Sequence, residues 1–144
     1  MRFWDSSAIV PLLVEQPSTV GLTIEFERDP DIVVWWATVV ECASALSRLE
    51  REEILDTTAL AVARNRLDRL AAAWREIQPV DRVRDVASRL LRVHPLRAGD
   101  AVQLAAAILA AEDEPRSLAL VTLDDRLLNA ADREGFPVIR PTGD

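Results

Sequence analysis

Hydrophobic residues along this chain form short continuous runs, separated by longer stretches in which they recur every three or four positions. The short runs are RFW at 2–4, DIVVWWA at 31–37, LALVT at 118–122 and FPVIR at 136–140. Continuous apolar runs rich in β-branched residues are typical of strands buried on both faces of a sheet. We therefore predict a strand at each run, with the last at the edge of the sheet because of Pro137.

The stretches between these runs have helical periodicity. Apolar residues at 39, 40, 43, 46 and 49 mark one amphipathic helix, and Trp74 ends the apolar stripe of a long one. Pro11 strains the middle of the first predicted helix, and Gly135 closes the last as a C-cap. The predicted helices span 7–15, 18–28, 38–53, 57–77, 81–92, 100–112 and 124–135.

Strands that alternate with helices favour crossover connections and a parallel sheet with helices on both faces. We therefore predict an α/β fold of three layers, α/β/α, around a mostly parallel sheet of four or five short strands. The helices within 38–77 form a projecting helical hairpin. A length of 144 residues, about half of them hydrophobic, suits a single domain over 1–144.

Charge and cysteine content exclude several kinds of function. The net charge is −7, which argues against a general surface for polyanions, and all 17 basic residues are Arg. Without Lys there is no P-loop lysine, no Schiff-base lysine and no lysine beside a phosphoacceptor aspartate. Cys42 is the only cysteine, which excludes an internal disulfide and a Cys-rich zinc site and fits a reducing compartment. Nothing resembles a signal peptide or a membrane span, so we expect a cytoplasmic protein.

Four acidic residues lie where these strands and helices meet. Asp5 and Asp124 each follow a strand, Glu41 lies one turn into the helix after the second strand, and Asp100 begins the apolar helix after the loop HPLRAG. In a parallel sheet the carboxyl ends of the strands and the amino ends of the helices share one edge, where sites are built. We therefore expect the four carboxylates to converge.

Each acid also has a purely structural explanation. Asp100 and Asp124 could cap helices, Asp5 could orient the turn that follows it, and residues 38–41 spell the capping box T-x-x-E. Capping explains any one of these residues but not all four together, because four neighbouring carboxylates repel one another unless a divalent cation lies among them. Ligands that are all oxygen favour Mg²⁺ or Mn²⁺ over zinc.

Four segments resemble those of the PIN-domain ribonucleases, and among them the VapC toxins of bacterial toxin–antitoxin pairs. The segments are WDSSAIV at 4–10, TVVECASAL at 38–46, LRAGDAVQLAAA at 96–107 and VTLDDRLLNAADREGFPVI at 121–139. The resemblance rests on their order, spacing and structural context, and it covers the whole chain. It implies a PIN-like fold and a Mg²⁺- or Mn²⁺-dependent endoribonuclease. It also implies a cognate VapB-like antitoxin that covers the acidic site, and a homodimer.

By this resemblance Asp5, Glu41, Asp100 and Asp124 are the catalytic and metal-binding quartet. Ser6 and Thr122 match the hydroxyl positions that support the site, and Asp124 is preferred to Asp125 because it has the T-x-D spacing. Attack by a water molecule would leave a 3′-hydroxyl and a 5′-phosphate. Candidate cations for the RNA backbone, each of which could equally lie on a solvated helix face, are Arg48, Arg51, Arg64, Arg66, Arg69 and Arg97.

Two other classes of function stay open. One is a phosphoacceptor or phosphatase-type α/β domain, which also gathers Asp at strand ends but relies on a lysine that this chain lacks. The other is a non-catalytic PIN-like module that acts only through protein contacts. Among the remaining residues of note, we expect His94 to be structural, at least one of Trp35 and Trp36 to be buried, and Trp74 to lie in the core of the hairpin.

Overall fold

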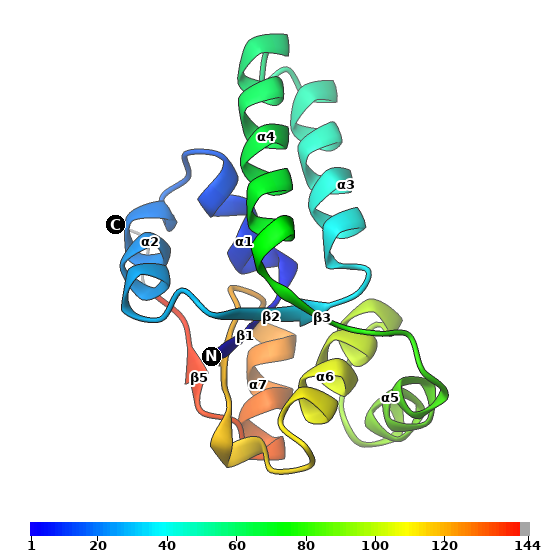
Figure 1. Ribbon diagram of the computed structural model, residues 1–144. Helices are drawn as coiled ribbons and strands as arrows, with labels where there is room; N and C mark the ends of the chain where they lie inside the picture. Colours follow the sequence, from blue (N-terminus) through cyan, green and yellow to red (C-terminus); the bar gives the residue numbers. More distant parts are fainter. Residues whose placement is uncertain (142–144) are drawn as a thin grey trace.

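A central sheet lies between two layers of helices in the computed structural model, which describes residues 1–141 (Figure 1). The strands are β1 (Arg2–Trp4), β2 (Ile32–Trp35), β3 (Arg75–Ile77), β4 (Ala119–Val121) and β5 (Val138–Ile139). The helices are α1 (Ser6–Leu13), α2 (Thr19–Arg28), α3 (Thr38–Arg51), α4 (Thr57–Ala73), α5 (Asp81–Val93), α6 (Ala98–Ala110) and α7 (Asp125–Glu134), with a 3₁₀ turn at Pro115–Ser117.

The five strands pair in the order β3-β2-β1-β4-β5, and every pairing is parallel. Strand β1 is central, with Arg2 opposite Ile32 of β2 on one side and Ala119 of β4 on the other. Since all strands run the same way, the residues that follow β1, β2 and β4 come out at one edge. The predicted three-layer α/β/α fold with its parallel sheet is confirmed.

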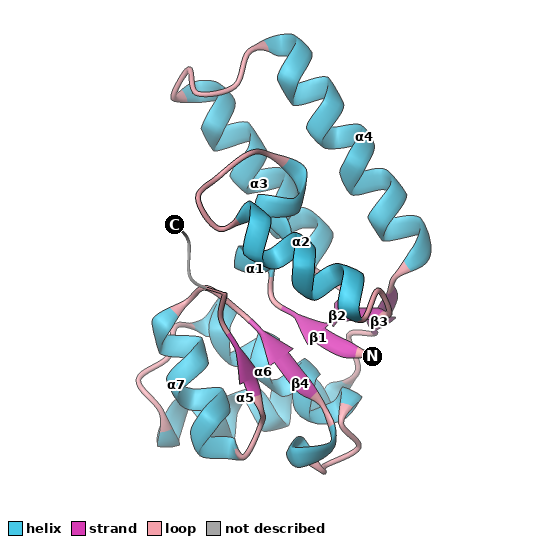
Figure 2. Ribbon diagram, turned by 90° about the vertical axis from the view of Figure 1, so that its left-hand side faces the viewer, coloured by secondary structure: helices cyan, strands magenta, loops and turns pink. Residues whose placement is uncertain are grey.

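Alternate side chains of the strands belong to two separate hydrophobic cores, one on each face of the sheet. Phe3 and Val33 pack with α5, α6 and α7, whereas Trp4 and Val34 pack with α1, α3 and α4 on the opposite face. All four residues of β2 are buried, as a strand covered on both faces requires. The helices α3 and α4 extend beyond the sheet as the predicted hairpin (Figures 1 and 2).

The tryptophan predictions are confirmed. Trp35 is buried in the core beneath α5 and α6, while Trp36 is half exposed and meets Trp35 edge to face. Trp74 is buried in the core that includes the hairpin, and its indole N–H donates to Glu76 Oε2 at 3.0 Å. Trp35 and Trp74 are therefore core residues, whereas Trp36 packs against Trp35 from the exposed side.

The prediction of one helix over 57–77 is wrong at its carboxyl end. Helix α4 ends at Ala73, Trp74 adopts an extended conformation, and Arg75–Ile77 forms the edge strand β3 beside β2. The hydrophobic stripe misled the prediction because Trp74 is buried in either conformation. Pairing with β2, a contact between residues far apart in sequence, decides the structure here.

The first helix is also shorter than predicted, because it ends at Leu13 rather than at residue 15. The hydroxyl of Thr19 donates to the carbonyl of Pro11 at 2.6 Å, lies 3.2 Å from the carbonyl of Val14, and accepts from the amide of Gln16 at 2.9 Å. One side chain thereby satisfies the backbone groups at the end of α1 and turns the chain into α2. Helix α6 begins two residues earlier than predicted, at Ala98.

His94 has the structural role that the sequence predicts. It is buried after α5, and its Nε2 lies 2.7 Å from Glu134 Oε2 at the end of α7, while Arg89 donates to Glu134 Oε1 at 3.1 Å. Burial raises the pKa of Glu134, but the hydrogen bonds from His94 and Arg89 outweigh it, so that its pKa lies below the usual 4.5. This pair joins two helices on the same face of the sheet.

Replacing Glu134 by Gln should therefore destabilise the protein at neutral pH by about 1.5–3 kcal/mol, the contribution typical of a hydrogen bond to a charged group. A carboxylate whose pKa is lowered by folding stabilises above its unfolded pKa and loses that effect as the pH falls through the folded one. The deficit, measured by urea unfolding, should thus shrink below about pH 4.5. Asp85→Asn, at an exposed acid of α5, is the matched control. Equal stability of Glu134→Gln and this control at pH 7 would contradict the assignment.

Candidate active site

Asp5 lies immediately after β1 and is 5% exposed. Its amide donates to the carbonyl of Val121 at 3.1 Å, which ties it to β4. The hydroxyls of Ser7 and Thr122 both donate to Oδ2, at 2.6 Å and 2.9 Å. Burial raises the pKa of Asp5, these two hydrogen bonds lower it in part, and the charge of Asp124 raises it again, with a raised pKa as the result.

Glu41 lies in the first turn of α3 and is held from two sides. Gln103 of α6 donates to Oε1 at 2.7 Å, and Ser6 of α1 lies 3.3 Å from Oε2. Burial raises the pKa of Glu41 above 4.5, and the charges of Asp5 and Asp100 add to the shift. The side chain thus faces the other carboxylates and is held by helices from both layers.

The capping box at residues 38–41 does not form. The N-cap of α3 is Ala37, and no side chain caps the helix. The Thr38 hydroxyl instead accepts from Gln103 Nε2 at 3.1 Å, the same amide nitrogen that binds Glu41. The explanation of Glu41 as part of a helix-capping box is therefore wrong.

Asp124 does cap a helix, as its structural explanation predicts. Its Oδ1 accepts from the amide of Leu127 at 2.9 Å, at the start of α7, and its own amide donates to Thr122 Oγ1 at 3.0 Å. Capping does not remove Asp124 from the acidic site, because its charge raises the pKa of both Asp5 and Asp100.

Asp100 lies in the first turn of α6, where Oδ2 is 3.4 Å from the backbone amide of Arg97. Its pKa is raised, first by burial and then by the charge of Asp124, with a further contribution from Asp5. Asp125, by contrast, is exposed and pairs with Arg140. The preference for Asp124 over its neighbour is consistent with this arrangement.

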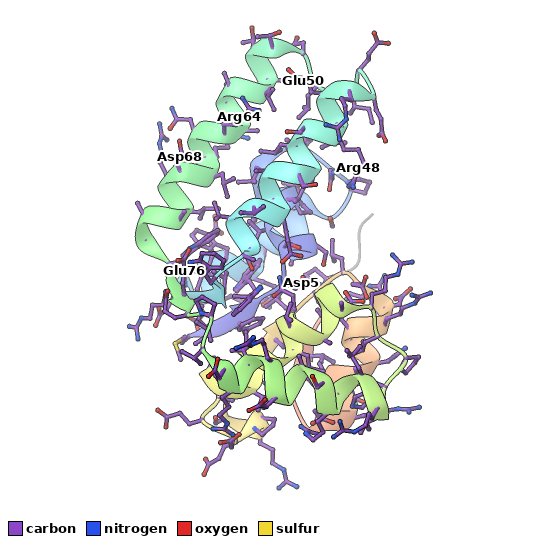
Figure 3. All side chains as sticks on the ribbon, turned by 90° about the vertical axis from the view of Figure 1, so that its right-hand side faces the viewer. Asp5, Arg48, Glu50, Arg64, Asp68 and Glu76 are labelled. Carbon is purple, nitrogen blue, oxygen red and sulfur yellow. The ribbon has the colours of Figure 1, made fainter. Side chains whose placement is uncertain are left out.

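The effect of these charges on one another's pKa values indicates that the four predicted acids lie in one neighbourhood at the carboxyl edge of the sheet. Figure 3 marks the place of Asp5, below the hairpin. Within residues 1–141, however, no three acidic, His or Cys side chains are arranged as a ready metal-ion site. The structure therefore holds four neighbouring carboxylates that repel one another but are not arranged as the ligands of one ion.

The hydrogen bonds of the four carboxylates nevertheless fit a divalent cation. Three of them make their strong contacts with the described residues through one oxygen, Asp5 Oδ2, Glu41 Oε1 and Asp124 Oδ1, and Asp100 has only the 3.4 Å contact of Oδ2 with the amide of Arg97. The second oxygen of Asp5 and of Glu41 has only a weaker contact with Ser6, at 3.4 Å and 3.3 Å. Ligands that are oriented through one oxygen and keep the other available are typical of metal sites. With all-oxygen donors, the residues fit Mg²⁺ or Mn²⁺.

Cys42 follows Glu41 and is buried, and its thiol has no part in this chemistry. Burial and the charges of Glu41 and Asp5 raise the pKa of Cys42 to about 12. The thiolate, which is the nucleophile and metal ligand, is therefore absent at neutral pH.

Two supporting residues were missed from the sequence, Ser7 and Gln103. Ser7 binds Asp5 and also accepts from the amide of Leu123 at 2.9 Å, so it links α1 to the segment after β4. Gln103 is 1% exposed. The signal for Gln103 was its amide in an otherwise apolar helix, three residues after Asp100 and hence on the same face.

The candidate arginines differ in their contacts and in their distance from the acidic site. Arg66 donates to the carbonyl of Leu13 at 3.1 Å and so supports the fold. Arg64 lies on α4, on the side of the hairpin away from Asp5 (Figure 3). Arg48 lines an open pocket together with Ser6 and Glu41. Arg48 therefore shares a cavity with two residues of the acidic site, and Arg97 lies beside Asp100, whose pKa its charge lowers in part.

No protein-family model and no curated protein matches the sequence, but solved structures match the fold. PAE2754 from Pyrobaculum aerophilum aligns over 96% of this chain and 89% of its own, at 21% identity and a TM-score of 0.64. FitAcB from Neisseria gonorrhoeae aligns over 96% of both chains, at 20% identity and a TM-score of 0.67. FitAB bound to an IR36 DNA fragment gives 18% identity, 98% and 95% coverage, and a TM-score of 0.67.

These matches extend over nearly the whole chain, and they define the architecture as the PIN-domain fold. The resemblance seen in the sequence is therefore confirmed for the fold. Within the described part of the chain, no helix is both long enough and apolar enough to cross a bilayer.

The crowding of carboxylates predicts an unusual effect of Asp100→Asn. A carboxylate whose pKa is raised by folding destabilises the native state above its unfolded value, near 3.8. The variant should therefore melt at a higher temperature than the wild type in EDTA at pH 7, and the difference should vanish as the pH falls below about 4.

Asp68→Asn provides the control, because Asp68 is an exposed acid on α4, distant from Asp5 (Figure 3). Thermal unfolding followed by circular dichroism suffices as the measurement. Mg²⁺ should stabilise the wild type more than Asp100→Asn, because a ligand that binds only the native state raises its stability. A lower melting temperature for Asp100→Asn in EDTA would contradict the interpretation.

Proposed function

We propose that this protein is a Mg²⁺- or Mn²⁺-dependent endoribonuclease, the toxin of a toxin–antitoxin pair. The observation that carries the proposal is the gathering of Asp5, Glu41, Asp100 and Asp124 at the carboxyl edge of a PIN-type sheet, each with an oxygen left for a ligand. The raised pKa values of Asp5, Glu41 and Asp100 support it, because like charges held together are suited to a cation, and Arg97 offsets only part of the shift at Asp100.

The residues divide the work according to their contacts. Asp5, Asp100 and Asp124 supply carboxylate oxygens to the cation, and Ser7 and Thr122 fix the orientation of Asp5. A bound divalent cation neutralises charge that develops on the scissile phosphate and makes a water molecule more acidic. Ser6, 3.3 Å from Glu41 and 3.4 Å from Asp5, lies between the two carboxylates and supports both.

Glu41 either supplies a ligand to a second cation or orients the attacking water. Its Oε1 is occupied by the Gln103 amide, so Oε2 is the atom that would receive a proton from that water. The raised pKa of Glu41, caused by burial and by Asp5 and Asp100, makes this carboxylate a better proton acceptor.

The resemblance to VapC toxins extends the proposal to partners and location. A VapB-like antitoxin would cover the acidic site, the toxin would form a homodimer, and both would act in the cytoplasm. The fold shared with FitAcB supports this assignment. FitAB is bound to a DNA fragment, but we propose RNA as the substrate of this chain.

The alternative is a non-catalytic PIN-like module that acts through protein contacts. The hydroxyl and amide groups that orient Asp5 and Glu41 favour a catalytic site, because a binding module gains nothing from buried carboxylates with raised pKa values. A phosphoacceptor or phosphatase-type domain is the weaker alternative, because the chain has no Lys.

The central test is cleavage of total cellular RNA by purified protein freed of any partner. Cleavage should require Mg²⁺ or Mn²⁺, stop in EDTA, and fall at least about 100-fold in Asp5→Asn and Asp100→Asn, since each removes a charged ligand. Asp68→Asn, outside the site, should cleave like the wild type. Folded, partner-free protein that binds no divalent cation would favour the non-catalytic module instead.

The chemistry at the cut ends is a second test. Hydrolysis by water should leave a 5′-phosphate and a 3′-hydroxyl, and a single 2′-deoxy substitution at the cleaved position should still allow cleavage, because the 2′-hydroxyl is not the nucleophile. Ligation-based sequencing of the fragments distinguishes the ends. A 2′,3′-cyclic phosphate among the products would refute the proposed attack by water.

A further inference from the structure

An open pocket of about 640 Å³ continues from the acidic site along the groove between α1 and α3. Ser6 and Glu41 belong both to the site and to the wall of this pocket, so the two are continuous. Arg48 also lines this pocket, at the part of its wall farther from the acidic site. Figure 3 shows Arg48 on α3, on the side of the hairpin away from Arg64 and Asp68.

The position of Arg48 follows from helix geometry. It comes seven residues after Glu41 on α3, so the two lie on the same face of the helix, about 10 Å apart along its axis. Ser44 lies between them and also lines the pocket. One face of α3 therefore carries an acid at the site, a hydroxyl in the middle and a cation beyond it.

Arg48 is exposed, and within residues 1–141 it forms neither an ion pair nor a side-chain hydrogen bond. Many other arginines of the chain do form ion pairs with the described residues: Arg2, Arg28, Arg75, Arg82, Arg84, Arg89 and Arg140. The guanidinium of Arg48 is thus available to a ligand that enters the pocket.

The other polar groups of the wall suit the same ligand. Ser44 and Gln16 supply a hydroxyl and an amide, which donate hydrogen bonds, and a phosphodiester offers only acceptors in return. A chain with a net charge of −7 repels a polyanion, so a strand that reaches the carboxylates needs a local cation on its path.

The geometry points to this pocket as the binding site for a backbone phosphate of the RNA substrate, next to the scissile one, with Arg48 as its positioning residue. The inference rests on the proposed function. The strand would run from the carboxylates along α3, and its register would be fixed by a contact to the backbone, independent of base sequence. The spacing of Arg48 from Glu41 means that the phosphate held there is not the one that is cleaved.

Binding can be measured without cleavage in protein that carries Asp100→Asn. The probe is a fluorescently labelled RNA of mixed sequence, titrated by anisotropy at several salt concentrations. Arg48→Ala should weaken binding by about tenfold and lower the slope of log affinity against log salt by about 1, because one phosphate contact is lost. Arg48→Lys should recover part of the affinity, since Lys binds phosphate as a point charge.

Arg64→Ala is the matched control, an exposed arginine of the same hairpin that is outside the pocket. Unchanged thermal stability of Arg48→Ala would show that the variant is folded. In cleavage assays, with Asp100 unchanged, Arg48→Ala should raise the KM for RNA with little change in kcat. This is expected for a residue that positions the substrate.

The outcomes separate this inference from the proposed function. RNA binding that depends on Arg48, in a protein that never cleaves with Mg²⁺ or Mn²⁺, would support the phosphate site and refute the nuclease. If the wild type cleaves RNA but Arg48→Ala and Arg64→Ala have equal affinities and salt slopes, the phosphate site is overturned. Arg48 would then be assigned to a contact with a protein partner. Absence of any RNA binding would overturn the phosphate site, and the cleavage assay on total cellular RNA would then decide the proposed function separately.

Discussion

The burial of Asp5 at the centre of a parallel sheet is the constraint on which the site depends. A carboxylate with 5% exposure is costly to hold in charged form, and the hydroxyls of Ser7 and Thr122 offset only part of that cost. The same two hydroxyls connect α1 to the segment after β4. The polar contacts that keep Asp5 in place thus also fix the relative positions of the elements that carry the other acids.

The parallel order of the strands explains why acids from distant parts of the sequence meet. Strand β1 pairs with β2 on one side and β4 on the other, so the segments after all three strands come out side by side. Gln103 then links the two helical layers across this edge through Thr38 and Glu41. Mutual repulsion would spread these carboxylates apart, and such hydrogen bonds oppose it.

Much of this arrangement was predictable from the sequence because it depends on local patterns. The buried strand at 31–37 and the T-x-D after the strand at 118–122 both carried their signals in neighbouring residues. Strand β3 was missed because it is defined by its pairing with β2, and the stripe ending at Trp74 gave the wrong boundary. Gln103 was missed because a single amide in an apolar helix does not reveal which carboxylate it will bind.

The capping explanations show why several explanations can hold for one residue. Asp124 caps α7 through one oxygen and couples to Asp5 and Asp100 as well, so a structural role and a role in the site are compatible. Glu41 does not combine the two roles, because its Oε1 binds Gln103 and no side chain caps α3. A helix that begins without a side-chain cap forgoes about 1 kcal/mol of stabilisation. Helices α1, α2 and α5 also begin without a side-chain cap, so the stability of this fold does not depend on capping α3. The carboxylate of Glu41 is instead held by Gln103 and Ser6, beside the other acids at the edge of the sheet.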